Sequence, residues 1–147
     1  MAKQIKFELT TPERVVEDRE VSGVTLPTRE GEITVLPGHI PLVATLQSGM
    51  ITLRSDAGEE YLAVSGGFVE VQSGGQVLVL ADSADRAEEL DLAKVEEARK
   101  RARQVLEEKR DLDDVSGAAA MAALERELAR ERVVRKYRDL KRRPISE

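Results

Sequence analysis

One stretch of the sequence decides the fold: Glu32-Ile33-Thr34-Val35-Leu36-Pro37-Gly38-His39-Ile40-Pro41-Leu42. Its apolar residues are interrupted by Pro-Gly-His and then by a second proline. Because proline has no backbone N–H and clashes with a preceding helical turn, this stretch cannot be an uninterrupted helix or a central strand. We therefore expect a strand that ends at a sharp turn near Pro37 and a second strand that begins near Leu42.

Outward from this stretch, the first half of the chain shows the period of β-strands. Ile5, Phe7 and Leu9 alternate with polar residues, which predicts a strand with one buried face. Further short apolar runs are separated by glycine-containing segments, among them Gly66-Gly67 and Gly74-Gly75, which predict hairpin turns or bulges. Eight or more short strands in about 80 residues, with no helix between them, predict a sandwich or flattened barrel. With only 2 Phe and no Trp available, Val, Leu and Ile must fill its core.

The second half of the chain has a different composition. All but one of the 10 glycines lie at or before Gly75, and most charged residues follow position 84. This change indicates a boundary between two parts of the chain. We expect a β domain over residues 1–84 and a second domain over residues 85–147.

The second part shows helical periodicity. Apolar side chains recur at three- and four-residue steps between Leu92 and Leu106, and Asp91 is a suitable N-cap for this helix. A break over Asp111–Gly117 precedes a second helix that extends to about Leu140. The sequence thus predicts a two-part α+β protein, in which an N-terminal all-β sandwich or flattened barrel is followed by a C-terminal antiparallel two-helix hairpin.

Composition restricts the chemistry and the location of the protein. The 147 residues include no cysteine, which excludes disulfide bonds and thiolate chemistry. No run of about 18 apolar residues is present, so we expect any membrane association to pass through a partner. The N-terminus lacks the apolar core of a signal peptide. The net charge is −5, so we expect that the chain as a whole does not bind nucleic acid. The last predicted helix is basic, however, and could bind an acidic surface.

No pattern of residues indicates a catalytic or metal site. His39 is the one histidine, whereas a metal site or a nucleophilic triad needs several converging groups. Neither glycine pair is followed by the Lys-Ser/Thr of a phosphate-binding loop or by the start of a helix. We expect no metal and no catalytic residue, and we expect His39 to cap or pack the Pro37-Gly38 turn.

One group of residues could bind an anion. Asp91, Lys94 and Arg101 lie along one edge of the first helix, and Arg126 and Arg130 lie on one face of the second. If the hairpin closes, these cations converge and repel one another unless an anion lies between them. The alternative is that all five are solvated charges on helix surfaces.

The hairpin is expected to be held weakly. Its apolar stripe is thin and rich in alanine, so each turn buries little area at about 25 cal/mol/Å². The stripe also changes face, since Met121 and Leu124 mark one side of the second helix whereas Val133 and Tyr137 mark another. A helix of this kind can dock in two places and detach from one of them. The alternative is a stable hairpin that stays on the sandwich.

Three segments stand out in combination: Leu36-Pro37-Gly38-His39-Ile40-Pro41-Leu42, the predicted hairpin Ser65-Gly66-Gly67-Phe68-Val69-Glu70-Val71, and Leu80-Ala81-Asp82-Ser83-Ala84-Asp85-Arg86-Ala87. Together with the two charged helices that follow, they resemble the epsilon subunit of F-type ATP synthase over the whole chain. Thr34 departs from the resemblance, because the family commonly has glycine there.

This resemblance implies a non-catalytic rotor component of the central stalk, which couples proton translocation to ATP synthesis. The family's sandwich grips the gamma subunit and rests on the c-ring, and the loop with Glu32 and His39 matches the part that touches the ring. The hairpin folds on the sandwich or extends into the catalytic head of alpha and beta subunits and hinders ATP hydrolysis. Basic residues such as Arg132, Arg135 and Lys136 would then meet an acidic segment of the catalytic subunits. The location implied is peripheral, on the cytoplasmic side of a bacterial cell membrane or on a photosynthetic membrane.

Some bacterial members of this family bind ATP on the hairpin through Ile/Leu-Asp-x-x-Arg-Ala. The matching residues here are Leu90-Asp91-Leu92-Ala93-Lys94-Val95, so lysine replaces arginine and valine replaces alanine. Lysine keeps the charge but lacks the bidentate fork of arginine. Arg101, Arg126 and Arg130 match the other basic positions. The resemblance therefore implies no required cofactor, with ATP as a regulatory ligand.

Two other classes of function stay open. A transcription factor that inserts a charged helical hairpin into RNA polymerase fits the hairpin and the acidic loop 111–114, although that family places the hairpin before its globular domain. An independent enzyme would need a site that the sequence does not display. Co-purification with the gamma subunit or with polymerase separates the first two classes.

Overall fold

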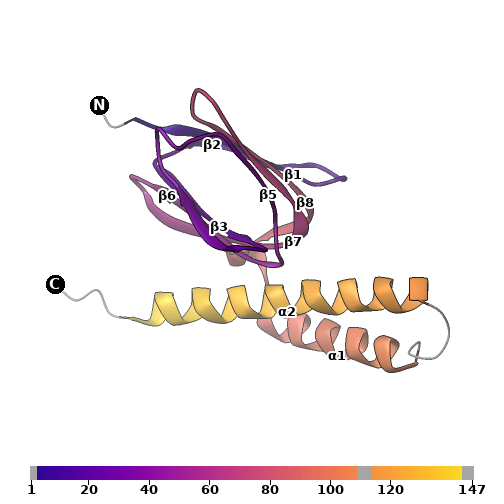
Figure 1. Ribbon diagram of the computed structural model, residues 1–147. Coiled ribbons are helices and arrows are strands. Elements are labelled where there is room, and N and C mark those ends of the chain that lie inside the picture. The colour runs from indigo at the N-terminus through magenta and orange to yellow at the C-terminus, as the bar shows by residue number, and fades with distance from the viewer. Residues whose placement is uncertain (1–2, 109–113, 144–147) are drawn as a thin grey trace.

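The computed structural model describes residues 3–108 and 114–143. Within these residues, eight strands form one continuous sheet that curves into a flattened barrel, and two helices lie side by side along its lower edge (Figure 1). The two-part α+β fold expected from the sequence is confirmed. The strands are β1 (Ile5–Thr10), β2 (Val15–Val21), β3 (Gly23–Thr28), β4 (Gly31–Val35), β5 (Leu42–Thr45), β6 (Gly49–Ser55), β7 (Gly58–Gln72) and β8 (Gln76–Arg86).

The strand order is β2-β1-β8-β7-β6-β3-β4, and β5 pairs with β7 off this path. The β1–β8 pair is parallel and the other ladders are antiparallel. An isolated antiparallel bridge between Thr28 and Leu46 joins the end of β3 to the residue that follows β5. These pairings leave the two layers face to face, with the core between them.

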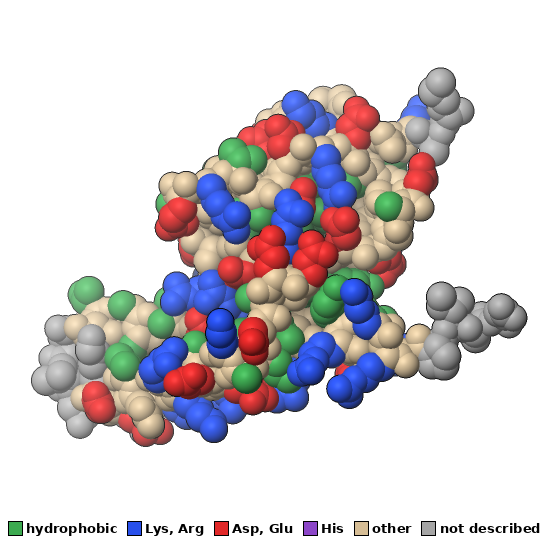
Figure 2. All heavy atoms as spheres, turned by 180° about the vertical axis from the view of Figure 1, so that it is seen from behind, with side chains coloured by type: hydrophobic (Ala, Val, Ile, Leu, Met, Phe, Trp, Pro, Cys, Tyr) green, Lys and Arg blue, Asp and Glu red, His purple; other side chains and the backbone are tan. Residues whose placement is uncertain are grey.

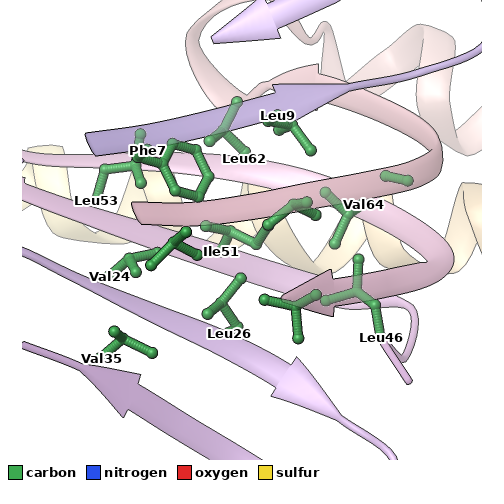
Figure 3. Packing of buried hydrophobic residues seen from close by; sticks show 14 of the residues in the cluster. Phe7, Leu9, Val24, Leu26, Val35, Leu46, Ile51, Leu53, Leu62 and Val64 are labelled. Atoms are coloured by element: carbon green, nitrogen blue, oxygen red, sulfur yellow. The ribbon is translucent and has the colours of Figure 1, made fainter. Parts of the chain in front are cut away.

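The core is aliphatic, as the composition predicts. Ile5, Phe7 and Leu9 of β1 are buried while Lys6 and Glu8 between them point outward, which is the two-residue period of a strand with one covered face. Phe7 is the one aromatic residue in the main cluster of the described residues. Figure 3 shows this ring among leucine, isoleucine and valine side chains that meet from both layers.

Of the two alternatives predicted for Gly66-Gly67, a hairpin turn or a bulge, the hairpin turn is wrong, because β7 continues through both glycines. Its ladder with β8 keeps one register from Leu62 to Gln72. Before the glycines β7 pairs with β6, and after them it pairs with β5, so the strand passes from one layer to the other at this point. At Gly67, where φ is 119°, a Cβ would lie 1.9 Å from the Leu80 carbonyl oxygen, so only glycine allows this close approach.

The predicted turn at Pro37-Gly38 is present between β4 and β5. The backbone N–H of His39 donates to the Leu36 carbonyl at 3.1 Å, and its ring Nδ1 lies 2.7 Å from the Ile40 carbonyl oxygen. Gly38 has a φ of 87°, which favours glycine at this position. His39 therefore packs the turn as expected.

After β8 the chain forms a short 3₁₀ turn, η1 (Ala87–Glu89), and the helices α1 (Leu92–Glu108) and α2 (Asp114–Arg142). Residues 111–113 of the predicted break lie outside the described residues, whereas its last part, 114–117, is helical. In Figure 1 α2 lies between the sandwich and α1. This arrangement explains the change of apolar face along α2, since the helix has a neighbour on two sides.

Candidate functional site

The candidate site is the docking interface, defined here as the contact of α2 with β6, β7 and η1. Its centre consists of Ala63, Ala87 and Val133, which are all buried. Four half-buried side chains surround them: Met50, Tyr61, Leu90 and Tyr137. Because two of the three buried residues are alanines, the apolar area that holds the hairpin to the sandwich is small. Weak docking, which the thin stripe predicts, is consistent with this geometry.

Among the described residues, one ion pair joins the hairpin to the sandwich. Arg130 Nε on α2 lies 2.6 Å from Asp85 Oδ2 on β8, and its Nη1 lies 2.7 Å from Glu127 Oε1. The Glu127 side chain is only 7% exposed, and Arg126 Nε lies 3.6 Å from the same oxygen. Arg130 therefore donates to two carboxylates, one on each part of the chain, and holds α2 in place on β8.

A second set of ion pairs joins the two helices. Arg99 Nη1 lies 3.1 Å from Glu131 Oε2, and Arg135 contacts Glu131 Oε1 at 3.1 Å and Glu96 Oε1 at 2.5 Å. Glu131 is buried between these two arginines. The hairpin thus has its own internal contacts, independent of those to the sandwich. We infer that α1 and α2 can move as one unit.

The connection between the sandwich and the hairpin is fixed at both of its ends. Arg86, the last residue of β8, contacts Glu17 at 2.8 Å and donates to the Val16 carbonyl at 3.0 Å. At the other end, the Asp91 carboxylate accepts the backbone N–H of Ala93 at 2.9 Å, which confirms the predicted N-cap of α1. Any hinge motion of the hairpin is therefore concentrated between these two anchored residues.

A cavity of about 220 Å³ opens between β7, η1 and the end of α2, and Glu59, Tyr61, Tyr137 and Lys141 line part of it. Burial, and then the hydrogen bond from its hydroxyl to Glu59 at 2.6 Å, raises the pKa of Tyr61 to about 12. The ammonium of Lys141 lies 5.0 Å from the centre of the Tyr137 ring. Figure 2 shows acidic side chains on the rim of the sandwich above basic side chains of the hairpin.

The residues predicted to bind a nucleotide do not meet in one site: Arg126 and Arg130 share Glu127 on α2, whereas Lys94 donates its backbone N–H to Asp91 at the start of α1. Arg130 and Arg126 contact carboxylates of this chain, and Arg101 pairs with Glu97 at 3.0 Å on the exposed face of α1. Lys94 is exposed one turn away from the cap. Leu90 and Asp91 line a shallow cavity with Val134, Tyr137 and Arg138, whereas none of the four predicted basic residues lines it.

The residues predicted to contact the c-ring lie on the surface of the sandwich. Glu32 is exposed on β4, and His39 is half-buried in the turn that follows. Beside His39, Leu36 and Ile40 are 55% and 74% exposed. This loop therefore offers apolar as well as polar groups to a partner.

The residues predicted to contact the catalytic subunits differ in how available they are. Arg135 is held by Glu96 and Glu131, as described above. Arg132 and Lys136 are exposed and line a cavity of about 260 Å³ with Ser48 and Met50. Arg132 also lines an adjoining groove with Arg29, a residue that sequence reasoning missed because no local pattern places it near α2.

Sequence reasoning also missed an apolar area on the outer face of the sheet. Phe68 and Leu80 are paired across β7 and β8, and both are more than half exposed. Val43 on the neighbouring β5 is 71% exposed. The alternation along these strands could have shown it, since apolar residues occupy both faces there.

Comparison with known proteins agrees with this architecture. The family model described as "ATP synthase, Delta/Epsilon chain, beta-sandwich domain" matches residues 4–87. The ATP synthase epsilon chain of Moorella thermoacetica is 45% identical over 127 residues, which cover 86% of this chain and 92% of that one. The epsilon chain of Dehalococcoides mccartyi is 43% identical over 94% of this chain and 96% of that one. The chain belongs to the ATP synthase epsilon chain family.

A solved structure supports the same membership. A chain of the Euglena gracilis mitochondrial ATP synthase, in a structure of OSCP, F1 and c-ring, matches with a TM-score of 0.72 and 28% identity over 89% of this chain and 81% of that chain. As an ATP synthase epsilon chain, the protein is a subunit of the complex and not an enzyme by itself. The comparisons support a rotor subunit and give no support to the transcription-factor alternative.

Two further findings concern the described residues. No helix among them combines the length and the apolar character needed to cross a bilayer. Nor do they gather three or more histidine, aspartate or glutamate side chains in a way that could hold a metal ion.

Proposed function

We propose that this epsilon chain is a central-stalk subunit whose sandwich binds the rotor and whose hairpin regulates ATP hydrolysis by leaving the docking interface. The observation that carries the proposal is the composition of this interface: two alanines and one valine form its centre, and within residues 3–108 and 114–143 one ion pair joins it to the sandwich. The helix pair has contacts of its own, so it can leave without losing its structure.

The sandwich offers two surfaces for rotor partners. The exposed apolar face with Val43, Phe68 and Leu80 suits the gamma subunit, because a large exposed apolar area typically indicates a protein contact. The loop beside Glu32 and His39 suits the c-ring. In this assembly the protein is peripheral to the membrane, on the cytoplasmic side of a bacterial cell. The Euglena structure, which contains F1 and a c-ring, supports these partners.

The hairpin offers its basic residues to the alpha and beta subunits once it is extended. Arg132 and Lys136 are exposed already, whereas Arg135 would first exchange its pairs with Glu96 and Glu131 for acidic groups of the partner. Such an exchange changes the energy little, which suits a reversible contact.

ATP is the proposed regulatory ligand of the hairpin, with Leu90, Asp91, Lys94, Arg101, Arg126 and Arg130 as its contacts. Its phosphates would compete with Asp85 and Glu127 for Arg130, so the affinity is expected to be low. The ligand shifts the hairpin only by the difference between its affinities for the two states.

Truncation tests the regulatory half of this proposal. A chain that ends after Glu89 keeps β8 and the contact between Arg86 and Glu17. We expect the truncated chain to assemble with the gamma subunit and to raise ATP hydrolysis by the complex. If the complex assembles and its rate of ATP hydrolysis stays unchanged, the hairpin does not inhibit hydrolysis.

A further inference from the structure

A groove of about 420 Å³ runs between α2 and the connections at one end of the sandwich. Arg29, Gln47 and Ser48 line it from the sandwich, and Glu125 and Arg132 line it from α2. It adjoins the cavity of about 260 Å³ that contains Ser48, Arg132 and Lys136. Because Ser48 and Arg132 belong to both cavities, the two form one continuous depression across the two parts of the chain. We call this depression the basic groove.

The cations of the basic groove differ from the other cations near the hairpin. Arg86, Arg130 and Arg135 are each within 3.1 Å of a carboxylate oxygen. In the described part of the chain, by contrast, neither Arg29 nor Arg132 has an ion pair. Two arginines without an ion pair therefore line the same groove, one from the sandwich and one from α2.

The same holds for Lys136, which has no ion pair among the described residues. Glu125 is the one carboxylate that lines the basic groove, and Asp82 lies close by, beside Gly66. Three basic residues and one acidic residue thus line the basic groove, which leaves an excess of positive charge. Like charges held together in this way are stabilised by an anion between them.

We propose that the basic groove binds a phosphate-bearing polyanion, which bridges Arg29 of the sandwich and Arg132 of α2. The planar guanidinium groups match phosphate oxygens, while the Gln47 amide and the Ser48 hydroxyl can donate further hydrogen bonds. No aromatic side chain lines the groove among the described residues, so a nucleotide base has no ring on which to stack. The groove therefore recognises the phosphate chain and not the base.

This site has a consequence for regulation, which rests on the proposed function. The ligand touches both parts of the chain, so it binds the docked hairpin and not the extended one, and it favours docking by mass action. It also occupies Arg132 and Lys136, the side chains proposed to meet the catalytic subunits. A polyanion in the basic groove and an acidic segment of the catalytic subunits would then exclude each other.

Calorimetric titration of the full chain in 0.1 M KCl tests the site, with tripolyphosphate and ATP as the two probes. We expect tripolyphosphate to bind the basic groove, and we expect ATP to bind there through its phosphates in addition to its proposed contacts on the hairpin. Arg29→Gln and Arg132→Gln should each weaken binding of tripolyphosphate about tenfold, which corresponds to the loss of one charge-assisted contact. Arg103→Gln is the matched control, because it removes the same charge from an exposed part of α1 outside both cavities.

Different results would overturn the assignment. If Arg103→Gln weakens binding as much as Arg29→Gln, the anion responds to net charge and not to the basic groove. If ATP binds, tripolyphosphate does not, and Arg101→Gln but not Arg29→Gln abolishes the affinity, the ligand occupies the α1 motif instead. Neither result bears on rotor assembly, which is measured separately by co-purification with the gamma subunit, so failure of this site leaves that part of the proposed function standing.

Discussion

The ion pair between Arg130 and Asp85 offers the sharpest test of how the hairpin is held. Asp85→Asn keeps the shape of the side chain and removes its charge, while Arg130→Gln removes the donor of both contacts. Arg101→Gln is a matched control, because its pair with Glu97 has the same chemistry but lies on the exposed face of α1. We expect the open population of the hairpin to increase most in Arg130→Gln and less in Asp85→Asn, and we expect no increase in the control.

The size of each effect on hairpin opening follows from how deeply the charged side chains are buried. Both side chains of the Arg130–Asp85 pair are about one quarter exposed, so solvent screening reduces its contribution to about 1 kcal/mol. Arg130→Gln loses this pair and also leaves Glu127, which is 7% exposed, with only Arg126 at 3.6 Å. An incompletely paired buried carboxylate adds about 2 kcal/mol. The open population should therefore rise about 5-fold in Asp85→Asn and about 100-fold in Arg130→Gln.

Thiol labelling can measure this opening, because the chain has no cysteine of its own. Ala63 is buried beneath α2, so in the Ala63→Cys background the labelling rate reports how often the hairpin leaves the sandwich. Ala81 is buried in the main core, and Ala81→Cys reports opening of the sandwich itself. The prediction requires faster labelling at position 63 with little change at position 81.

Two results would contradict a role of the Arg130–Asp85 pair in holding the hairpin. Equal labelling of Ala63→Cys with and without Asp85→Asn or Arg130→Gln would mean that the pair does not hold the hairpin. A parallel rise at Ala81→Cys would mean that the substitutions unfold the sandwich and do not release α2.

Three further predictions concern stability. Gly67→Ala should lower the melting temperature of the whole sandwich, because its Cβ would lie 1.9 Å from the Leu80 carbonyl oxygen; a variant that melts normally would show that β7 does not need glycine at its bend. Asp91→Ala removes the N-cap of α1, which should destabilise this helix by about 1 kcal/mol and lower the helix content measured by far-UV circular dichroism. Unchanged helicity would contradict the role of the cap. The pKa of Tyr61 is raised from 10.0 to about 12, so its contribution to stability is complete below pH 10 and is lost as the pH rises to about 12. Denaturant unfolding across this range should show a smaller loss in Tyr61→Phe than in the parent, and equal losses would contradict the raised pKa.

Local patterns were sufficient for most elements of the fold. The alternation in β1 predicts which side chains enter the core, and Asp91 caps α1 as its position before an apolar stripe indicates. In each case the property depends on residues within one or two turns of the chain, which the sequence displays directly.

The failure at Gly66-Gly67 has a different origin. A glycine pair between two apolar runs is compatible with a hairpin turn and with a bend in one strand, because both need the same backbone freedom. The decision depends on the partners of β7, which are β6 on one side of the bend and β5 on the other. Such pairings join residues far apart in the sequence, so a single sequence does not display them.

For the candidate site, the sequence predicted which types of residue take part but not which residues contact one another. The sequence identifies Arg126 and Arg130 as members of a basic face, but their partners depend on the position of α2 relative to β8. Asp85 is 45 residues away from Arg130, and no spacing rule connects them. Arg29 joins Arg132 in the basic groove for the same reason, since only the docked hairpin brings the two together.

In the proposed function, the hairpin must leave the sandwich before it can hinder ATP hydrolysis. Ser48 and Lys136 line one cavity from the two parts of the chain, so Ser48→Cys with Lys136→Cys allows a short bismaleimide cross-linker to hold the hairpin in its docked position. The rate of ATP hydrolysis by the assembled complex, compared before and after cross-linking, is the most direct measurement. We predict that cross-linking raises the rate to that of the complex with the chain truncated after Glu89. An inhibition that persists with the hairpin locked on the sandwich would contradict the account.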